Sequence, residues 1–223
     1  MNSSALIIMA KEPKVGSTKT RLCPPLNLDE AAELYEALLW DTVEMVEGVQ
    51  DIDLAIAITP PESSDYFKRI THSKTILIPV SCADIGECLV YVLNQLINMG
   101  YQRVMALNSD GPSLPPEYIH IAHQNLDLYD LVLGPAHDGG YYLVGFKKMH
   151  TSIFRGIDWS TDQVLKQTLQ KAEQLNLSVH LLPTWYDIDT AADLDRLQDE
   201  LERLPTESLK HTRQFLDQWS EKN

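Results

Sequence analysis

Short apolar runs alternate along the chain with longer stretches in which apolar residues recur at helical spacing. The first run, Ala5 to Ala10, contains β-branched residues and predicts a buried strand. Over residues 28 to 48 the apolar positions repeat every three or four residues, which predicts an amphipathic helix, opened by a capping box of Asn27 and Glu30. This alternation continues to residue 182, so we predict a mostly parallel sheet with helices on both faces.

The same patterns predict the remaining elements. Asp138-Gly139-Gly140 is expected at the tip of a small hairpin, and either Ser160 or Thr161 is expected to cap the helix that follows. Further strands are predicted at residues 54–58, 75–80, 103–107, 130–135 and 178–182, and further helices at residues 64–70, 84–99, 116–126, 161–175, 190–200 and 207–220. The predicted organisation is therefore a single α/β domain over residues 1–205, with a doubly wound sheet, followed by a helical tail over residues 206–223.

Composition narrows the class of protein. The 223 residues are 44% hydrophobic and carry a formal charge of −14. This acidic balance argues against a nucleic-acid or anionic-membrane partner. No apolar stretch reaches the roughly 18 residues of a membrane span, and the N-terminus lacks the layout of a signal peptide. Three cysteines, Cys23, Cys82 and Cys88, are an odd and sparse set that favours a reducing compartment and gives no metal spacing, so we expect a cytoplasmic protein.

A basic loop follows the first predicted strand. Residues 11 to 22 contain four cations, Lys11, Lys14, Lys19 and Arg21, and one acid, Glu12. Ligands of open α/β sheets bind beyond the carboxyl ends of the strands, and lysine and arginine donate charge-assisted hydrogen bonds to phosphate. The loop therefore predicts a site for a phosphate-bearing ligand, although a solvated basic loop is an equal alternative. The spacing of its glycine and lysine is not that of a Walker A loop.

Carboxylates follow other strands at the same predicted edge. Asp110 lies on a Gly-Pro turn after the fourth strand, where a divalent cation would bridge it to phosphate oxygens. A turn aspartate that binds its own backbone is at least as common. In the hairpin, His137, Asp138 and Tyr141 are placed to line a flat ligand, but ordinary turn chemistry also explains the paired glycines. Asp187, just before the last predicted helix of the domain, is the remaining candidate site carboxylate.

Six motifs in a fixed order carry a resemblance over residues 5 to 200. They are Lys11-x-Pro13-x-x-Gly16-x-x-Lys19-Thr20-Arg21-Leu22, Asp84-x-Gly86-Glu87, Ser109-Asp110-x-Pro112-x-Leu114, Gly134-Pro-Ala-x-Asp138-Gly-Gly-Tyr-Tyr-Leu143, Trp159-Ser-Thr161 and Asp187-x-Asp189-Thr190-x-x-Asp193-Leu194. With them the chain resembles the GT-A-like superfamily of nucleotide-sugar glycosyltransferases and sugar nucleotidyltransferases. It is most similar to a bacterial glycosyltransferase-like family described as radical-SAM/selenodomain-associated transferases.

The resemblance implies the roles of the site residues. Asp110 and Asp189 would bind Mg²⁺ or Mn²⁺, and we add Asp187 as a third candidate ligand. Lys19, Arg21, Asp110 and Asp138 are the candidate catalytic residues. The nucleotide would be held by Lys11, Pro13, Gly16, Lys19, Thr20, Arg21 and Glu87, and the acceptor by His137, Asp138, Gly139, Gly140, Tyr141, Trp159, Ser160 and Thr161. The chain departs from the family pattern at Ser113, where an acid is usual, and at Cys88, where arginine is usual.

The leading hypothesis is a metal-dependent transferase of the glycosyltransferase-A type that uses a nucleotide-sugar or nucleotide donor and a small-molecule acceptor. One alternative is a nucleotidyltransferase that releases pyrophosphate, of the guanylyl or cytidylyl type acting on a sugar phosphate or phospho-acid. The departures at Ser113 and Cys88 motivate another alternative, a non-catalytic nucleotide-binding or scaffold protein. The tail helix would pack on the body or on a second subunit, so a homodimer is also open. The general base is left open among His137, Asp138 and Asp187.

Overall fold

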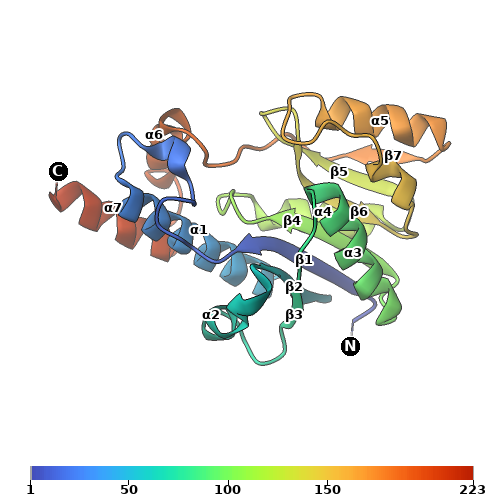
Figure 1. The fold of residues 1–223 in the computed structure, drawn as a ribbon, viewed down its shortest axis with the longest axis horizontal. Helices are drawn as coiled ribbons and strands as arrows, with labels where there is room; N and C mark the ends of the chain where they lie inside the picture. Colours follow the sequence, from blue (N-terminus) through green and yellow to red (C-terminus); the bar gives the residue numbers. More distant parts are fainter. Residues whose placement is uncertain (1, 223) are drawn as a thin grey trace.

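The computed structural model describes residues 2–222 and contains one seven-stranded sheet with the order β3-β2-β1-β4-β6-β5-β7 (Figure 1). All neighbouring strands pair in parallel except β6, which is antiparallel to both β4 and β5. The predicted mostly parallel sheet and the hairpin are confirmed. The strands are β1 (Ser4–Lys11), β2 (Ile52–Thr59), β3 (Ile76–Pro79), β4 (Arg103–Asn108), β5 (Leu131–Pro135), β6 (Tyr141–Phe146) and β7 (Val179–Leu181).

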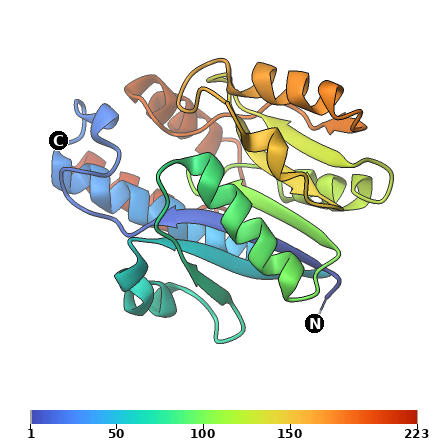
Figure 2. The ribbon, with the colours of Figure 1, turned by 45° about the vertical axis from the view of Figure 1, so that its right-hand side comes forward.

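Helices cover both faces of the sheet because side chains along each buried strand alternate between the faces. In β1, Leu6 and Ile8 pack in the cluster that holds α1 (Leu28–Glu47), α2 (Ser64–Ile70) and α4 (Pro116–Asn125). Ala5 and Ile7 point to the opposite face, which α3 (Ile85–Asn98) and α5 (Val164–Gln174) cover. Figure 2 shows α3, in green, lying across this second face. The doubly wound architecture predicted from the sequence is therefore confirmed.

The C-terminal segment packs on the outer side of α1. Helices α6 (Ala191–Leu201) and α7 (Lys210–Lys222) share a third apolar cluster with α1, and Figure 1 shows α7 alongside α1. The buried Asp41 carboxylate of α1 accepts hydrogen bonds from the backbone N–H groups of His211 and Thr212 and from the Thr212 hydroxyl. These contacts satisfy the first N–H groups of α7, which helix geometry alone leaves without partners. The tail helix thus packs on the body of its own chain.

One predicted helix start is wrong. Helix α5 begins at Val164, with Gln163 rather than Ser160 or Thr161 at its N-cap. The Thr161 hydroxyl donates to the Asp158 carbonyl and accepts from the Gln163 N–H group, and Ser160 has φ 63°. The segment before α5 is therefore a turn closed by its own hydrogen bonds, which delays the helix by a turn. Three short 3-10 helices complete the chain: η1 (Thr20–Leu22), η2 (Pro61–Ser63) and η3 (Thr151–Phe154).

One edge of the sheet collects the segments that the sequence marked as chemical. The parallel strands β1, β4 and β5 end there, and the antiparallel β6 begins there. The basic loop, the Asp110 turn and the hairpin tip therefore lie at the same edge. The segment after β7 joins them, since the Ile188 N–H group donates to the Asp110 carbonyl at 2.9 Å. Within residues 2–222, no helix combines the length and the apolar character of a membrane span.

Gly134→Ala is expected to destabilise the protein by ~1–3 kcal/mol, because overpacking a filled core strains it. A Cβ atom at Gly134 would lie 2.3 Å from Cζ of Tyr142. That ring is held in place, since its hydroxyl donates to the Pro183 carbonyl at 3.0 Å. The free energy of unfolding in urea measures the effect. Gly48→Ala, whose Cβ would meet nothing closer than 3.4 Å, is the control and should change stability by less than about 0.5 kcal/mol. Equal effects of the two variants would contradict this packing.

Candidate active site

A cleft of about 850 Å³ opens above the strand ends, within the usual range for a small-molecule site. Several of the predicted residues line it together. Lys11, Lys19, Thr20 and Arg21 come from the basic loop, Asp110 from the turn after β4, Asp138 from the hairpin tip, Ser160 from the turn before α5, and Asp187 and Asp189 from the segment before α6. The fold thus brings together residues that the sequence holds more than a hundred positions apart.

Lys19 lines this cleft, and its side chain is only 7% exposed. The loop before it folds on itself, because the Lys14 carbonyl accepts from the N–H groups of Ser17 and Thr18. The Lys19 ammonium lies 3.1 Å from Oδ1 of Asp110 and 2.7 Å from Oδ1 of Asp189. Burial alone would lower the pKa of Lys19, but the two carboxylates outweigh it and hold the pKa above its ordinary value. Lys19 is therefore a permanent cation between two predicted metal ligands.

Asp187 is a half-buried carboxyl beside this pair. Burial first, and then the neighbouring Asp110 carboxylate, raise its pKa to about 7, against the effect of a hydrogen bond from Asn108. That bond, from the Asn108 side-chain N–H group to Oδ1 of Asp187, is 2.7 Å long. Asp138 raises the pKa further. The Lys19 ammonium lowers the pKa only in part, so Asp187 is harder to ionise than an ordinary carboxyl.

Asp187→Asn is expected to stabilise the protein, and the gain should depend on pH. The folded-state pKa of about 7 lies above the unfolded value near 3.9, so wild-type stability falls as the pH rises between the two values. The amide carries no such penalty and still accepts from Asn108. We expect a gain on the order of 2 kcal/mol near pH 8 that shrinks toward pH 4. Thermal unfolding across this pH range measures it, and a gain independent of pH would contradict the assignment.

The charge of the cleft is not set by the basic loop alone. The cations that line the cleft, Lys11, Lys19 and Arg21, face five carboxylates. The cleft is therefore net acidic when all groups are ionised. Because a nucleotide diphosphate or triphosphate would add several negative charges, its binding here requires further positive charge. Carboxylate oxygens are the ligands that Mg²⁺ and Mn²⁺ prefer, so Asp110, Asp187 and Asp189 suit the predicted ion in kind, but the Lys19 ammonium lies between Asp110 and Asp189.

Among the described residues, one set of three potential ligands converges, and it is Asp41, Glu44 and His211 rather than the three predicted aspartates. Its members already have structural partners. Asp41 caps α7, and Oε1 of Glu44 lies 2.7 Å from the Lys210 ammonium. This cluster is explained by the docking of α7 on α1.

The hairpin tip holds Asp138 in a defined position. Its Oδ1 accepts from the Gly140 N–H group at 2.8 Å. Gly139 has φ 88°, and a Cβ atom there would lie 2.3 Å from the Asp162 carbonyl oxygen. Its own carbonyl accepts from the Leu165 N–H group at 2.8 Å, which ties the tip to the start of α5. Gly139 thus supports the hairpin tip and does not line the cleft.

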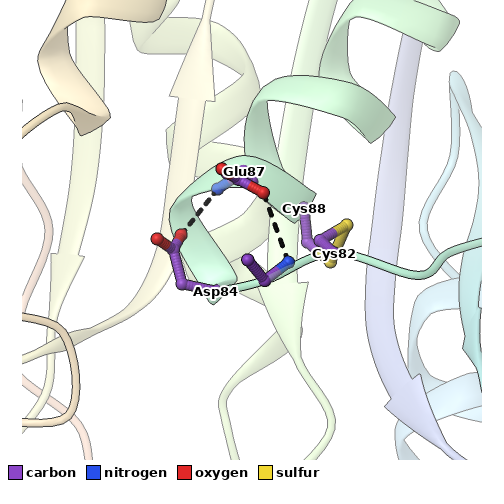
Figure 3. Close-up of a disulfide and its surroundings, with 5 residues drawn as sticks. Cys82, Asp84, Glu87 and Cys88 are labelled. Atoms are coloured by element: carbon purple, nitrogen blue, oxygen red, sulfur yellow. Dashed lines mark hydrogen bonds between the residues drawn. A yellow bond between two sulfur atoms is a disulfide. The ribbon is translucent and has the colours of Figure 1, made fainter.

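Part of the predicted acceptor set lines a smaller cavity beside the cleft. Asp138, Gly140, Tyr141, Trp159, Ser160 and Thr161 all line this space of about 190 Å³. Five predicted residues, Pro13, Gly16, Glu87, His137 and Gly139, line neither space. Glu87 instead lies in the first turn of α3. Its carboxylate accepts from the Ala83 N–H group, and its backbone N–H group donates to the Asp84 carboxylate (Figure 3).

Two of the three cysteines are bonded, contrary to what the sequence indicated. Cys82 and Cys88 form a disulfide between the loop after β3 and the first turn of α3, and Cys23 is free (Figure 3). Both bonded residues line the cleft. Cys88, which stands where the resemblance led us to expect arginine, is therefore tied to the wall of the cleft and offers no free side chain.

Sequence reasoning missed a buried support beneath the basic loop. The Tyr35 hydroxyl shares a 2.9 Å hydrogen bond with the Ser109 hydroxyl and accepts from the Lys11 N–H group at 3.1 Å. Burial first, and then Asp110, raise the pKa of Tyr35 to about 12. Tyr35 links α1, β1 and the turn after β4, so it positions the loop against Asp110. In the sequence it is one more apolar position on the helix face, and nothing there distinguishes it.

Ser113, the other departure from the family pattern, lies outside the cleft lining. Its hydroxyl donates to the Tyr186 hydroxyl at 3.4 Å and accepts from the Trp185 indole N–H group at 3.3 Å. It therefore supports the segment that carries Asp187.

Comparison with solved structures defines the class. The fold is that of the nucleotide-diphospho-sugar transferases. A protein from Desulfovibrio desulfuricans G20, provisionally described as such a transferase, aligns with a TM-score of 0.85 and 31% identity over 96% of this chain and 99% of its own. A 4-diphosphocytidyl-2C-methyl-D-erythritol synthase from Anaerococcus prevotii DSM 20548 shares the fold, with a TM-score of 0.61 and 13% identity over 90% of this chain and 97% of its own. A CMP:2-keto-3-deoxy-manno-octonic acid synthetase solved with CTP also shares the fold, with a TM-score of 0.53 and 11% identity over 90% of this chain and 99% of its own.

The chain belongs to the bacterial family described as "Uncharacterized protein conserved in bacteria (DUF2064)", whose model matches residues 42–161. That segment runs from α1 through β6 to the turn before α5, so it includes Asp110 and the hairpin tip. A sequence search of curated proteins found no match.

Proposed function

We propose that this protein is a metal-dependent transferase that binds a nucleotide or nucleotide-sugar donor in the cleft above the strand ends. The observation that carries the proposal is the position of Lys19, buried between Asp110 and Asp189. The two carboxylates hold the Lys19 ammonium in a fixed position, and a preorganised donor of this kind stabilises charge that develops on phosphoryl oxygens once a metal ion offsets the carboxylates. The names of the related structures, a nucleotide-diphospho-sugar transferase and two enzymes of cytidylyl chemistry, support the same class.

Each residue of the cleft has a role in this proposal. Asp110, Asp187 and Asp189 would hold Mg²⁺ or Mn²⁺, which neutralises phosphate charge when bound. Lys19 donates to the phosphates from the floor of the cleft. Arg21, whose side chain is 72% exposed and lies 3.7 Å from Asp189, is free to turn toward them from the rim. Asp138, fixed by the Gly140 N–H group, faces the acceptor side.

The basic loop favours nucleotidyl transfer over glycosyl transfer. In nucleotidyl transfer the leaving group is pyrophosphate, which carries more negative charge than the nucleoside diphosphate released in glycosyl transfer. Lys19 and Arg21 therefore stabilise the departure of pyrophosphate more strongly. The glycosyl version, which matches the resemblance to the radical-SAM/selenodomain-associated transferases, remains the alternative.

Product analysis with donors labelled in the base, the sugar and the phosphates tests the proposal. The enzyme would be incubated with Mg²⁺ or Mn²⁺ and a panel of acceptors, and the released group identified. Acceptor-dependent pyrophosphate supports nucleotidyl transfer and contradicts glycosyl transfer, whereas a released nucleoside diphosphate does the reverse. If nucleotides bind with the same affinity in EDTA and no product forms, the protein is a nucleotide-binding scaffold.

A further inference from the structure

We infer that the acceptor is a neutral alcohol or phenol with an apolar body about the size of a six-membered ring, and that the smaller cavity beside the cleft holds this body. The inference rests on the proposed function and specifies the second substrate of the same site. The two adjoining spaces differ in character, since the larger cleft is charged and the smaller cavity is mostly apolar.

The walls of the smaller cavity are apolar and come from four elements. Ala106 of β4 and Val144 of β6 form its floor on the sheet, and Leu89 of α3 and Val164 of α5 cover it. The rings of Tyr141 and Trp159, which lie edge to face with centroids 6.4 Å apart, complete the walls. Such surfaces bind hydrocarbon or aromatic groups, because moving these groups out of water is favourable.

The position of Trp159 depends on a glycine. A Cβ atom at Gly86 would lie 2.6 Å from the Trp159 indole nitrogen. The first turn of α3 therefore needs glycine at this position for the indole to pack against it. The aromatic wall thus packs on the start of α3, the segment that also carries Asp84 and Cys88 of the larger cleft.

The cavity opens toward the cleft at its polar end. Asp138, Asp187 and Asn108 line both spaces, as do Met9, Ile85 and Ser160. A ligand whose apolar body fills the cavity would therefore place its polar end beside Asp138 and Asp187. Asp138, which the Gly140 N–H group holds in place, accepts a hydrogen bond from a hydroxyl group but repels a phosphate or a carboxylate. The acceptor end is consequently a neutral hydroxyl.

The size of the cavity sets the size of the body. Apolar cavities of ~150 Å³ are known to stay free of water and to bind benzene. At about 190 Å³, this one is large enough for a single ring with one or two extra carbon atoms.

The test follows the methyl resonances of Leu89, Val144 and Val164 in the full chain by NMR during titration. The probes are phenol, benzyl alcohol and cyclohexylmethanol at millimolar concentration, compared with glucose, glycerol and phenyl phosphate. We expect saturable shifts for the first three probes only. In Ala106→Leu, whose larger side chain fills the cavity, their affinity should fall at least about tenfold. Ala106→Ser keeps the side chain small and should bind as the wild type does. Val164→Phe is a second filling variant, from another element, if Ala106→Leu does not fold.

The outcomes separate this inference from the proposed function, because nucleotide binding with Mg²⁺ is measured on the same samples. Nucleotide binding with no response to the apolar alcohols overturns the inference and leaves the proposed function standing. Binding of glucose or phenyl phosphate at these methyl groups also overturns it. Saturable alcohol binding that the filling variants abolish supports the inference. If no nucleotide binds to the same samples, that result counts against the proposed transferase function and not against the inference.

Discussion

Lys19→Met is expected to lower turnover by ~10²–10³-fold, the usual effect of removing one preorganised donor from a developing phosphate charge. Methionine keeps the length and the apolar stem of lysine but removes its ammonium group. The variant also leaves Asp110 and Asp189 without the cation that lies 3.1 and 2.7 Å from them, so nucleotide affinity should fall with turnover. Steady-state kinetics and calorimetric titration with the donor measure the two effects.

The matched control is Lys14→Met. Lys14 belongs to the same loop and carries the same charge, but its side chain is 54% exposed and its acidic partner, Glu12, is 3.9 Å away. Such an exposed pair contributes little, so both turnover and affinity should stay close to wild type. Equal losses in the two variants would show that the loop acts through its overall charge and would contradict a specific role for Lys19.

Asp110→Asn is expected to remove most of the metal dependence of nucleotide binding and to lower turnover by at least ~10²-fold, since Mg²⁺ and Mn²⁺ bind carboxylates far better than amides. The amide is nearly isosteric, so the turn after β4 should keep its shape. Calorimetric titration with the donor in Mg²⁺ and in EDTA measures the change. If Asp110→Asn binds nucleotide as the wild type does, with and without metal, the scaffold hypothesis replaces the transferase.

Asp84→Asn is the control for lost charge alone. Asp84 also lines the cleft, and its carboxylate accepts from the Glu87 N–H group to cap α3. Asparagine caps helices equally well, so this substitution removes one negative charge from the cleft and leaves the fold intact. Metal-dependent binding should persist in Asp84→Asn, which would separate ligation by Asp110 from a general effect of acidity.

The strands and helices could be predicted from the sequence because they depend on local periodicity. The 20-residue helix α1, opened by Asn27 and Glu30, and the hairpin tip at Asp138 are both local patterns. The gathering of the site at one edge followed from the rule that ligands bind beyond the strand ends. The start of α5 was missed because the competing turn is held by the specific hydrogen bonds of Thr161, which periodicity does not encode.

The pairings within the site could not be predicted from local sequence. Lys19 and Asp189 are 170 positions apart, so their contact is a product of the tertiary fold. The family resemblance assigned Lys19 to the phosphates and Asp189 to the metal, and it did not indicate that the two side chains would bind each other. Cys82 and Cys88 lie close in sequence, but an odd number of cysteines pointed away from a bond. Ala106 and Val144 look like ordinary core positions in a strand, so the cavity beside them is visible only in three dimensions.

The most direct test of the proposed donor site is a thermal-shift screen of the whole chain. The ligands are the nucleoside triphosphates and the UDP-, GDP-, ADP-, CDP- and TDP-sugars, each with Mg²⁺, Mn²⁺ or EDTA. A ligand at a hundredfold excess over its Kd stabilises the folded state by ~2.7 kcal/mol, which a melting curve resolves. We predict that one nucleotide raises the melting temperature with metal and much less with EDTA. A shift of equal size in EDTA, or no shift with any of these nucleotides, would contradict a metal-dependent donor site in this cleft.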